Sequence, residues 1–210
     1  MQELLEIDLA VMRWINVVWV HPWLDLFFLV IASFHIWKWP LAIGAVIMAI
    51  WGGFRARVFL VLMLLCLLIG DSGINWSIKR TVDRPRPHES VENLRRVRME
   101  GWKVVAEPSR IREVKHGNSM TSGHACNNFA LATLATILFR PWGMLVWIWA
   151  SGVAYSRIYT ADHFPSDILV SLPVAVLYTL GIVWASRCIW KRYAPRYLPQ
   201  LYERHPDLIR

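Results

Sequence analysis

Three short polar segments of this sequence combine basic, hydroxyl and histidine side chains at spacings that suit chemistry on a phosphate group. The first segment, Lys79–Pro87, reads Lys-Arg-Thr-Val-Asp-Arg-Pro-Arg-Pro. Arginine presents a rigid fork of donors to phosphate oxygens, and lysine presents a point charge. Asp71, Asn75 and Lys79 are spaced by four residues, so they would share one face of a helix. Polar groups inside a membrane helix usually point inward to a functional site.

The second segment, Ser119–His124, opens an apolar run that we expect to be helical. Serine or threonine before such a run is a natural helix N-cap, and the free N–H groups of a helix start favour an anion. Gly123 allows the backbone to approach a ligand closely. Asn127 and Asn128 follow His124 by three and four residues, so we expect all three side chains on one helix face.

The third segment, Ser156–Asp167, contains a histidine and a carboxylate one helical turn apart, at His163 and Asp167. A carboxylate at that spacing can accept a bond from one ring N–H, which fixes the tautomer and leaves the other ring nitrogen free to attack. Pro165 suits the first turn of a helix that begins here. The segment therefore predicts a histidine nucleophile with an orienting partner.

Each segment by itself also has a purely structural interpretation. The basic residues of the first could extend their charges to a membrane surface. The second could be an ordinary cap with an interfacial histidine, and the third a His–Asp pair that satisfies itself. The occurrence of all three at the ends of apolar runs favours one common site.

Taken together, the patterns Lys-x6-Arg-Pro, Ser-Gly-His and Ser-Arg-x5-His-x3-Asp resemble the type 2 phosphatidic acid phosphatase superfamily. The resemblance covers residues 79–167 and, by its pattern of apolar runs, most of the chain. It implies that His163 is the nucleophile that forms a phosphohistidine, that Asp167 orients it, and that His124 protonates the leaving group. It also implies a set of phosphate-binding residues, namely Lys79, Arg86, Ser122, Gly123 and Arg157.

One position departs from the family's pattern, which usually has proline before Ser-Gly-His, whereas this chain has Thr121. Proline would fix φ and stiffen the loop, and threonine can cap the helix instead. We expect the site to be intact with threonine in place.

Long apolar runs must position these segments. The chain has 210 residues, 56% hydrophobic and only 18% charged, and a helix needs about 20 mostly apolar residues to cross a bilayer. We expect an all-α, six-transmembrane-helix bundle that forms one domain, residues 1–210, with its catalytic core at 79–167 and its site at the extracytoplasmic interface. The predicted spans lie near residues 14–34, 38–52, 57–77, 122–139, 142–159 and 166–189.

Charge and cysteine content narrow the function classes. The net charge of +8 lies between and after apolar runs, which favours membrane lipids as partners over nucleic acid. Cys66, Cys126 and Cys188 lie inside apolar runs, and no group of His, Cys, Asp and Glu has metal-ligand spacing. We therefore expect no metal and no cofactor.

The distribution of basic residues predicts the orientation. Arg55 and Arg57, Arg140, and the tail with Lys191 and Arg192 are typical of cytoplasmic segments. This predicts a protein of the bacterial inner membrane whose site faces the periplasm or the outside.

The sequence thus predicts a metal-independent phosphatase that hydrolyses a lipid phosphate or lipid pyrophosphate. Undecaprenyl pyrophosphate, phosphatidylglycerol phosphate, phosphatidic acid and lipid A phosphate all present the same phosphoryl group, so the sequence leaves the substrate open, and it does not indicate an oligomeric state. A lipid phosphotransferase with the same phosphohistidine is one alternative. A lipid transporter is another, since buried charge also marks transport paths.

Overall fold

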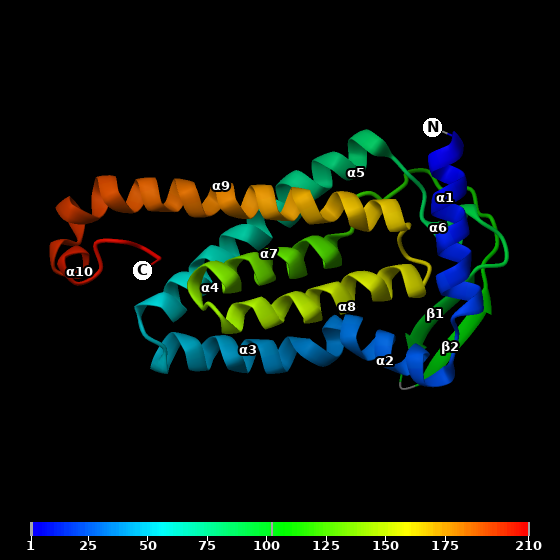
Figure 1. Cartoon of the computed structure of the whole chain (residues 1–210), viewed down its shortest axis with the longest axis horizontal. Helices are drawn as coiled ribbons and strands as arrows, with labels where there is room; N and C mark the ends of the chain where they lie inside the picture. Colours follow the sequence, from blue (N-terminus) through cyan, green and yellow to red (C-terminus); the bar gives the residue numbers. More distant parts are fainter. Residues whose placement is uncertain (1, 102, 210) are drawn as a thin grey trace.

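The computed structural model describes residues 2–101 and 103–209 as long helices with a two-stranded sheet at one end (Figure 1). The first elements are α1 (Gln2–Arg13), η1 (Trp14–Val18), α2 (Pro22–Ala32), α3 (Phe34–Trp51), α4 (Phe54–Leu65), η2 (Cys66–Asn75) and α5 (Trp76–Val82). After them come α6 (Pro87–Ser90), β1 (Arg95–Glu100), β2 (Lys103–Pro108), α7 (Gly123–Leu138), η3 (Trp142–Leu145), α8 (Val146–Tyr159), α9 (Pro165–Tyr197) and α10 (Pro199–Arg204).

Helix α7 lies at the centre of the bundle and packs against α4, η2, α8 and α9. Its buried face is rich in small side chains, including Ala125, Ala130 and Ala132, each of which is fully buried. Small residues let membrane helices approach closely, which strengthens their packing. The centre of the bundle therefore holds the start of α7, where the second polar segment lies, in a fixed position.

Among the described residues, three helical runs are long and apolar enough to cross a membrane, namely α3, Phe54–Ser90 and α9. A fourth candidate is the pair Leu5–Val18 and Pro22–Ala32, which is bent by 115°. With 16 and 14 residues, α7 and α8 are shorter than the roughly 20 residues that a full crossing needs. The six predicted spans are therefore not confirmed.

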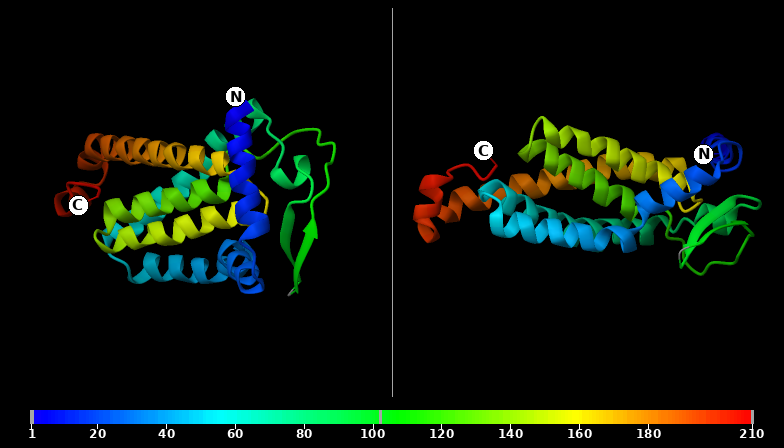
Figure 2. Two further views of the ribbon diagram at one scale, coloured as in Figure 1. Left: turned by 45° about the vertical axis from the view of Figure 1, so that its right-hand side comes forward. Right: turned by 90° about the horizontal axis from the view of Figure 1, so that it is seen from below.

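The predicted span near 14–34 is wrong as one continuous helix. His21 precedes Pro22 and is extended (φ −154°, ψ 142°), as the residue before a proline prefers to be, and its ring accepts a hydrogen bond from the Trp23 N–H. The chain turns there, and α1 crosses the end of the bundle at a steep angle to the other helices (Figures 1 and 2). The start of α1 consequently lies at the opposite end of the molecule from the C-terminus (Figure 1).

The all-α prediction also needs correction, because β1 and β2 form an antiparallel hairpin within the long polar connection. Gly101 lies at its turn with φ +60°, a conformation that glycine adopts readily. Leu94 and Val97 are buried against Met12, Ile15 and Tyr159. The hairpin thus packs on the N-terminal helices and on the end of α8.

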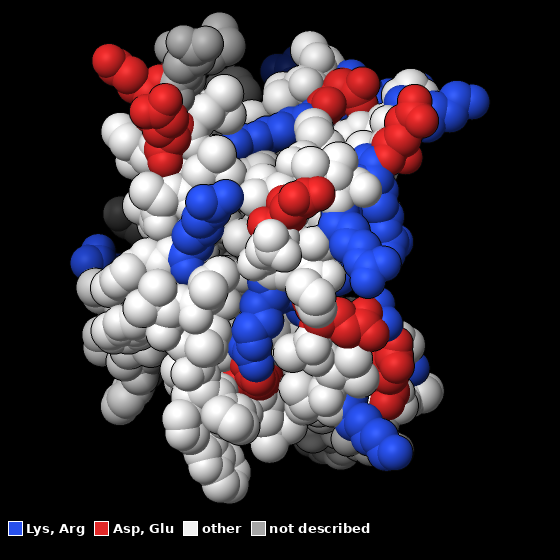
Figure 3. Space-filling model, turned by 90° about the vertical axis from the view of Figure 1, so that its right-hand side faces the viewer, with Lys and Arg blue, Asp and Glu red and all other residues white. Residues whose placement is uncertain are grey.

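The flanks and the end of the bundle have different surfaces. Large apolar side chains on the helices are exposed, among them Trp23, Trp142, Ile148 and Leu169, each at least 70% accessible. The end that carries α1 and the hairpin instead presents lysine and arginine side chains among aspartate and glutamate (Figure 3). This distribution suits helices in a bilayer with one charged end at its surface.

Candidate active site

His163 lies in the short loop between α8 and α9 and is 3% exposed. Its Nδ1 atom is 2.6 Å from the carbonyl oxygen of Ser119. A carbonyl oxygen only accepts, so Nδ1 carries the proton and donates it. The other ring nitrogen, Nε2, then has a free lone pair, which is the form of histidine that can act as a nucleophile.

Asp167 supports this arrangement from the first turn of α9, although not by the direct bond expected from the spacing. Its Oδ2 lies 3.8 Å from Nδ1 of His163, beyond hydrogen-bond distance. The carboxylate accepts bonds from the Ser119 hydroxyl, from the Phe164 N–H at 2.8 Å and from Arg84 at 2.8 Å. Asp167 therefore holds Ser119, whose carbonyl in turn orients His163. The negative charge of Asp167 remains close enough to the His163 ring to interact with it electrostatically.

A close backbone approach brings Ser119 to the histidine. Its N–H donates to the Arg84 carbonyl at 2.9 Å, and the Gly117 N–H donates to Asp83 at 2.7 Å. A Cβ atom at Gly117 would lie 2.1 Å from the carbonyl carbon of Arg84. Only glycine fits there, so this residue allows the first and second polar segments to meet.

Arg157, in the last turn of α8, lies beside the histidine and is paired with Asp162. Asp162 also accepts a hydrogen bond from Thr160 at 2.8 Å and lies 3.9 Å from a guanidinium nitrogen of Arg86. The Nε of Arg157 is buried and has no hydrogen-bond partner among the described residues. A buried donor without a partner is costly, and a phosphate oxygen would supply the missing acceptor.

The charges around the loop set its protonation states. Burial lowers the pKa of His163 below its ordinary value, the nearby Asp167 carboxylate opposes this, and the charges of Arg157 and Arg86 lower it further. Burial alone would raise the pKa of Asp162, but Arg157, Thr160 and Arg86 hold it below its ordinary value. The site therefore favours a neutral imidazole beside an ionised carboxylate.

The predicted helix face of Asp71, Asn75 and Lys79 meets the start of α7. Asn75 donates to Asp71 at 3.4 Å and accepts from the Thr121 hydroxyl at 2.9 Å. A Cβ atom at Gly123 would lie 2.9 Å from Asp71 Oδ1 and 3.8 Å from the Lys79 ammonium. Thr121 is thus fully buried and bonded, and the missing side chain at Gly123 gives the Asp71 carboxylate room.

Ser122 and His124 occupy the first turn of α7. Ser122 is the N-cap, and its hydroxyl accepts from the Ala125 N–H at 3.4 Å while its own N–H donates to Ser171 at 2.9 Å. The N–H of Ser122 is thus engaged within the protein, whereas its hydroxyl accepts one bond and keeps a proton to donate. The His124 side chain is exposed, and the charge of Arg157 acts on it. Arg86 similarly acts on both Lys79 and His163, so the three segments meet in one place.

Residues that the sequence analysis did not assign complete the site. Arg84 bridges Asp167 and Asp8, which lies 2.6 Å away, and its guanidinium stacks on the Phe164 ring at 3.9 Å. Asp8 also accepts from the Ser166 N–H at 2.8 Å. Arg84 was visible within the first polar segment, but nothing in the sequence pointed to Asp8, which joins α1 to the start of α9.

Within the part of the chain that the structure describes, no group of three or more His, Cys, Asp or Glu side chains could hold a metal ion. The independence of activity from metals stays a prediction. Chemically, the arrangement offers a buried nucleophilic nitrogen, a second histidine within electrostatic reach and three cations around them.

The chain is similar to known proteins in fold and in sequence. The crystal structure of Aquifex aeolicus LpxE superimposes with a TM-score of 0.60 at 22% identity, covering 84% of this chain and 94% of that one. This similarity shows a shared fold. A lipid A 4'-phosphatase of Bacteroides thetaiotaomicron is 26% identical over 158 residues. The match covers 73% of this chain but only 58% of that relative's length.

The family comparison covers all three polar segments and most of the bundle, because the match extends from residue 55 to residue 193. It therefore includes Lys79, His124 and His163 together. On this evidence the chain belongs to the PAP2 superfamily.

Proposed function

We propose that this chain is an integral membrane lipid phosphate phosphatase that works through a phosphohistidine on His163. The observation that carries the proposal is the buried His163, whose Nδ1–H is held by the Ser119 carbonyl. Beside it, the Nε–H of Arg157 has no partner within the described part of the chain. The lipid A 4'-phosphatase relative supports a lipid as substrate.

In the first step, Nε2 of His163 attacks phosphorus while the bond from phosphorus to the leaving oxygen breaks. His124 gives a proton to that oxygen, as a general acid does for a poor leaving group. The imidazole becomes cationic as the bond to phosphorus forms. The Asp167 carboxylate, 3.8 Å from Nδ1, stabilises that charge.

In the second step, a water oxygen attacks phosphorus and its proton passes to His124. The bond between phosphorus and Nε2 breaks, its electron pair returns to the imidazole, and inorganic phosphate leaves. Lys79, Arg86 and Arg157 stabilise the charge on the phosphoryl oxygens in both steps. Gly123 contributes space for the Asp71 carboxylate, beside Lys79, rather than a donor side chain.

We further propose that residues 1–210 form a single membrane-embedded phosphatase domain in the bacterial inner membrane, with its site toward the periplasm. The turn between α3 and α4, the turn between α7 and α8, and the end of α9 lie at the end of the bundle opposite the hairpin (Figure 1). These segments carry Arg55, Arg57, Arg140 and Lys191, and basic residues favour the cytoplasmic side.

The test is phosphate release by the purified protein from a panel of four lipids: undecaprenyl pyrophosphate, phosphatidylglycerol phosphate, phosphatidic acid and lipid A phosphate. We expect release from at least one, no release by His163→Ala, and full activity in a chelator. Loss of activity in the chelator that one metal restores would contradict metal independence. Transfer of the phosphate to a second lipid, with none released, would replace the phosphatase by a phosphotransferase.

A further inference from the structure

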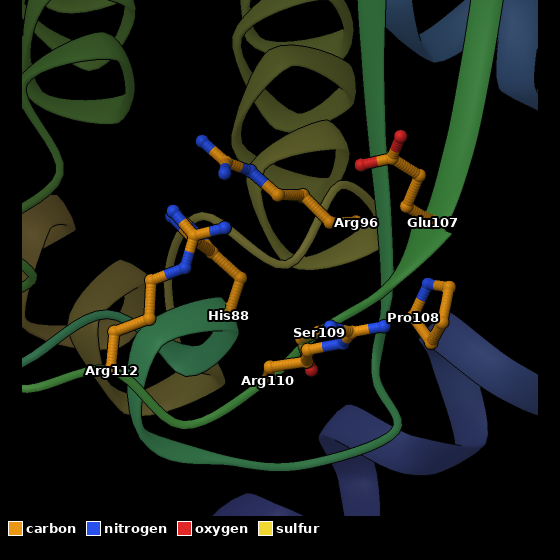
Figure 4. Close-up of a pocket in the computed structure, with 7 residues that line it drawn as sticks. All are labelled: His88, Arg96, Glu107, Pro108, Ser109, Arg110 and Arg112. Atoms are coloured by element: carbon orange, nitrogen blue, oxygen red, sulfur yellow. The ribbon is translucent and has the colours of Figure 1, made fainter.

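A second cluster of cations lies beside the proposed site, in a cavity of about 390 Å³ between the hairpin, α6 and the chain that follows β2. We call it the arginine pocket, and its polar lining comes from His88, Arg96, Glu107, Ser109, Arg110 and Arg112 (Figure 4). None of these residues belongs to the proposed catalytic machinery.

The arginine pocket has an excess of positive charge. Arg96, Arg110 and Arg112 form no ion pair with a carboxylate among the described residues. The single carboxylate of the lining, Glu107, is already paired with Arg98 at 3.2 Å. In Figure 4 the guanidinium groups of Arg96 and Arg112 extend from opposite sides toward the same region. Such a pair of planar donors suits the oxygens of a phosphate group.

The pocket shares a wall with the catalytic loop. The backbone N–H of His88 donates to the Ala161 carbonyl at 3.2 Å, and its ring Nδ1 lies 2.8 Å from the same oxygen. That ring nitrogen is also 3.8 Å from Asp162. An anion in the pocket is therefore close to the reacting phosphoryl group but separated from it by His88 and by residues 161–162.

The pocket is also held in place by bonds that do not depend on a ligand. The Arg112 N–H donates to the Glu89 carbonyl at 2.9 Å, and the Ser109 hydroxyl donates to the Val91 carbonyl at 2.6 Å. Arg95, next to Arg96 on β1, binds Asp25 of α2. A site that is rigid before binding loses little conformational entropy when a ligand enters.

We propose that the arginine pocket binds a second phosphate of the lipid substrate, carried on a spacer away from the phosphate that reacts with His163. The proposal rests on the phosphatase function above and narrows its substrate class. The shared wall requires several atoms between the two phosphates, as a glycerol or a sugar provides. Phosphatidic acid has no second phosphate, and in a pyrophosphate lipid the two phosphates are joined directly. Phosphatidylglycerol phosphate and a lipid A that carries two phosphates meet the requirement.

The test compares paired lipids that differ in the second phosphate, namely phosphatidylglycerol phosphate with phosphatidic acid, and lipid A carrying two phosphates with lipid A carrying one. In Arg96→Gln/Arg112→Gln we expect KM for the two-phosphate lipids to rise at least about tenfold, as expected when charge-assisted hydrogen bonds are lost. We expect kcat, and KM for the one-phosphate lipids, to change less than about twofold on the same grounds. Lys103→Gln, on the same hairpin but outside the pocket, removes one positive charge and should change neither. Equal changes for both lipids of each pair would overturn the proposal.

Two further arms separate the possible sources of the anion. If the pocket binds headgroups of the surrounding bilayer instead, turnover of phosphatidic acid will depend on the vesicle's content of phosphatidylglycerol, and the double variant will lose that dependence. If it binds only free phosphate, added inorganic phosphate will change wild-type turnover but not that of the double variant. Either result overturns the proposal.

Binding of the paired lipids to His163→Ala tests the pocket without turnover. The proposal is supported, even if phosphate release fails, when the two-phosphate lipid binds more tightly than its partner and His163→Ala/Arg96→Gln/Arg112→Gln loses this difference. Equal binding of the two lipids to His163→Ala overturns the proposal.

Discussion

The arginines at the charged end of the molecule fall into two regions. They differ in whether carboxylates already accept the hydrogen bonds of the guanidinium N–H groups. Behind the histidine, Arg84 bridges Asp8 and Asp167, and beneath the hairpin Arg95 binds Asp25 through two nitrogens. On the substrate side, Arg157 has a buried Nε without a partner among the described residues, and Arg96 lines an open pocket. The same side chain thus fixes structure where carboxylates occupy its donors and can bind phosphate where donors remain.

Among the residues around His163, the largest effect should come from His124. A lipid alkoxide needs a proton as it leaves, so His124→Ala should slow monoester hydrolysis by about 10²–10⁴-fold. A pyrophosphate substrate expels a phosphate monoester, which leaves more easily and should be affected less. Turnover of one lipid of each kind by the purified variant measures this difference. Equal losses for both would argue against His124 as the leaving-group acid.

Arg157 should rank next. Arg157→Gln should reduce kcat by about 10²–10³-fold, the range seen when one donor to a developing oxyanion is removed. The change also leaves Asp162 without its partner, so Arg157→Gln/Asp162→Asn is the matched control. If the double variant recovers wild-type kcat, Arg157 merely neutralises Asp162 and does not bind phosphate.

Arg95 should behave in the opposite way, because its donors are occupied. Arg95→Gln leaves the buried Asp25 unpaired and should lower the free energy of unfolding by about 3 kcal/mol, the lower end of the range for a broken buried pair, since Arg95 is partly exposed. Turnover of phosphatidic acid per folded molecule should change less than about threefold. Arg95→Gln/Asp25→Asn should regain part of the stability, and a large fall in kcat without loss of stability would remove the contrast between the two regions.

The smallest effect should appear in the pH profile. The reactive imidazole is neutral, and burial with Arg157 and Arg86 lowers the pKa of His163 below 6.5. The acidic limb of kcat/KM should therefore lie below pH 6.5. Arg86→Gln removes one of the lowering charges, so the limb should move to higher pH as the rate falls. A limb that stays at the wild-type pH in this variant would show that the charge of Arg86 does not act on His163.

Sequence spacing predicted the meeting of the three polar segments because their residues are few and chemically specialised. The charge of Arg86 acts on both Lys79 and His163, and the charge of Arg157 acts on both His124 and His163. Spacing could not show that the Ser119 carbonyl, rather than Asp167, would hold the histidine proton. A backbone oxygen has no signature in the residue type that carries it.

The fold was less predictable at the N-terminus and in the long connection. The apolar residues near 14–34 are compatible with a span, but the helix ends at Val18, and Trp19 and the extended His21 before Pro22 turn the chain so that α1 crosses the bundle end. The hairpin was missed because β1 is dominated by arginines, which do not show the usual apolar alternation of a strand. Its pairing depends on Leu94 and Val97 finding the N-terminal helices, a contact that no local pattern encodes.

The most direct test is to trap the covalent intermediate. Wild-type protein is mixed with a lipid labelled in its phosphate and quenched in alkali, in which phosphohistidine is stable, and the labelled residue is identified by mass spectrometry. We predict label on Nε2 of His163 and neither label nor turnover in His163→Ala. Label on another residue, or phosphate release by His163→Ala near the wild-type rate, would contradict nucleophilic catalysis by His163.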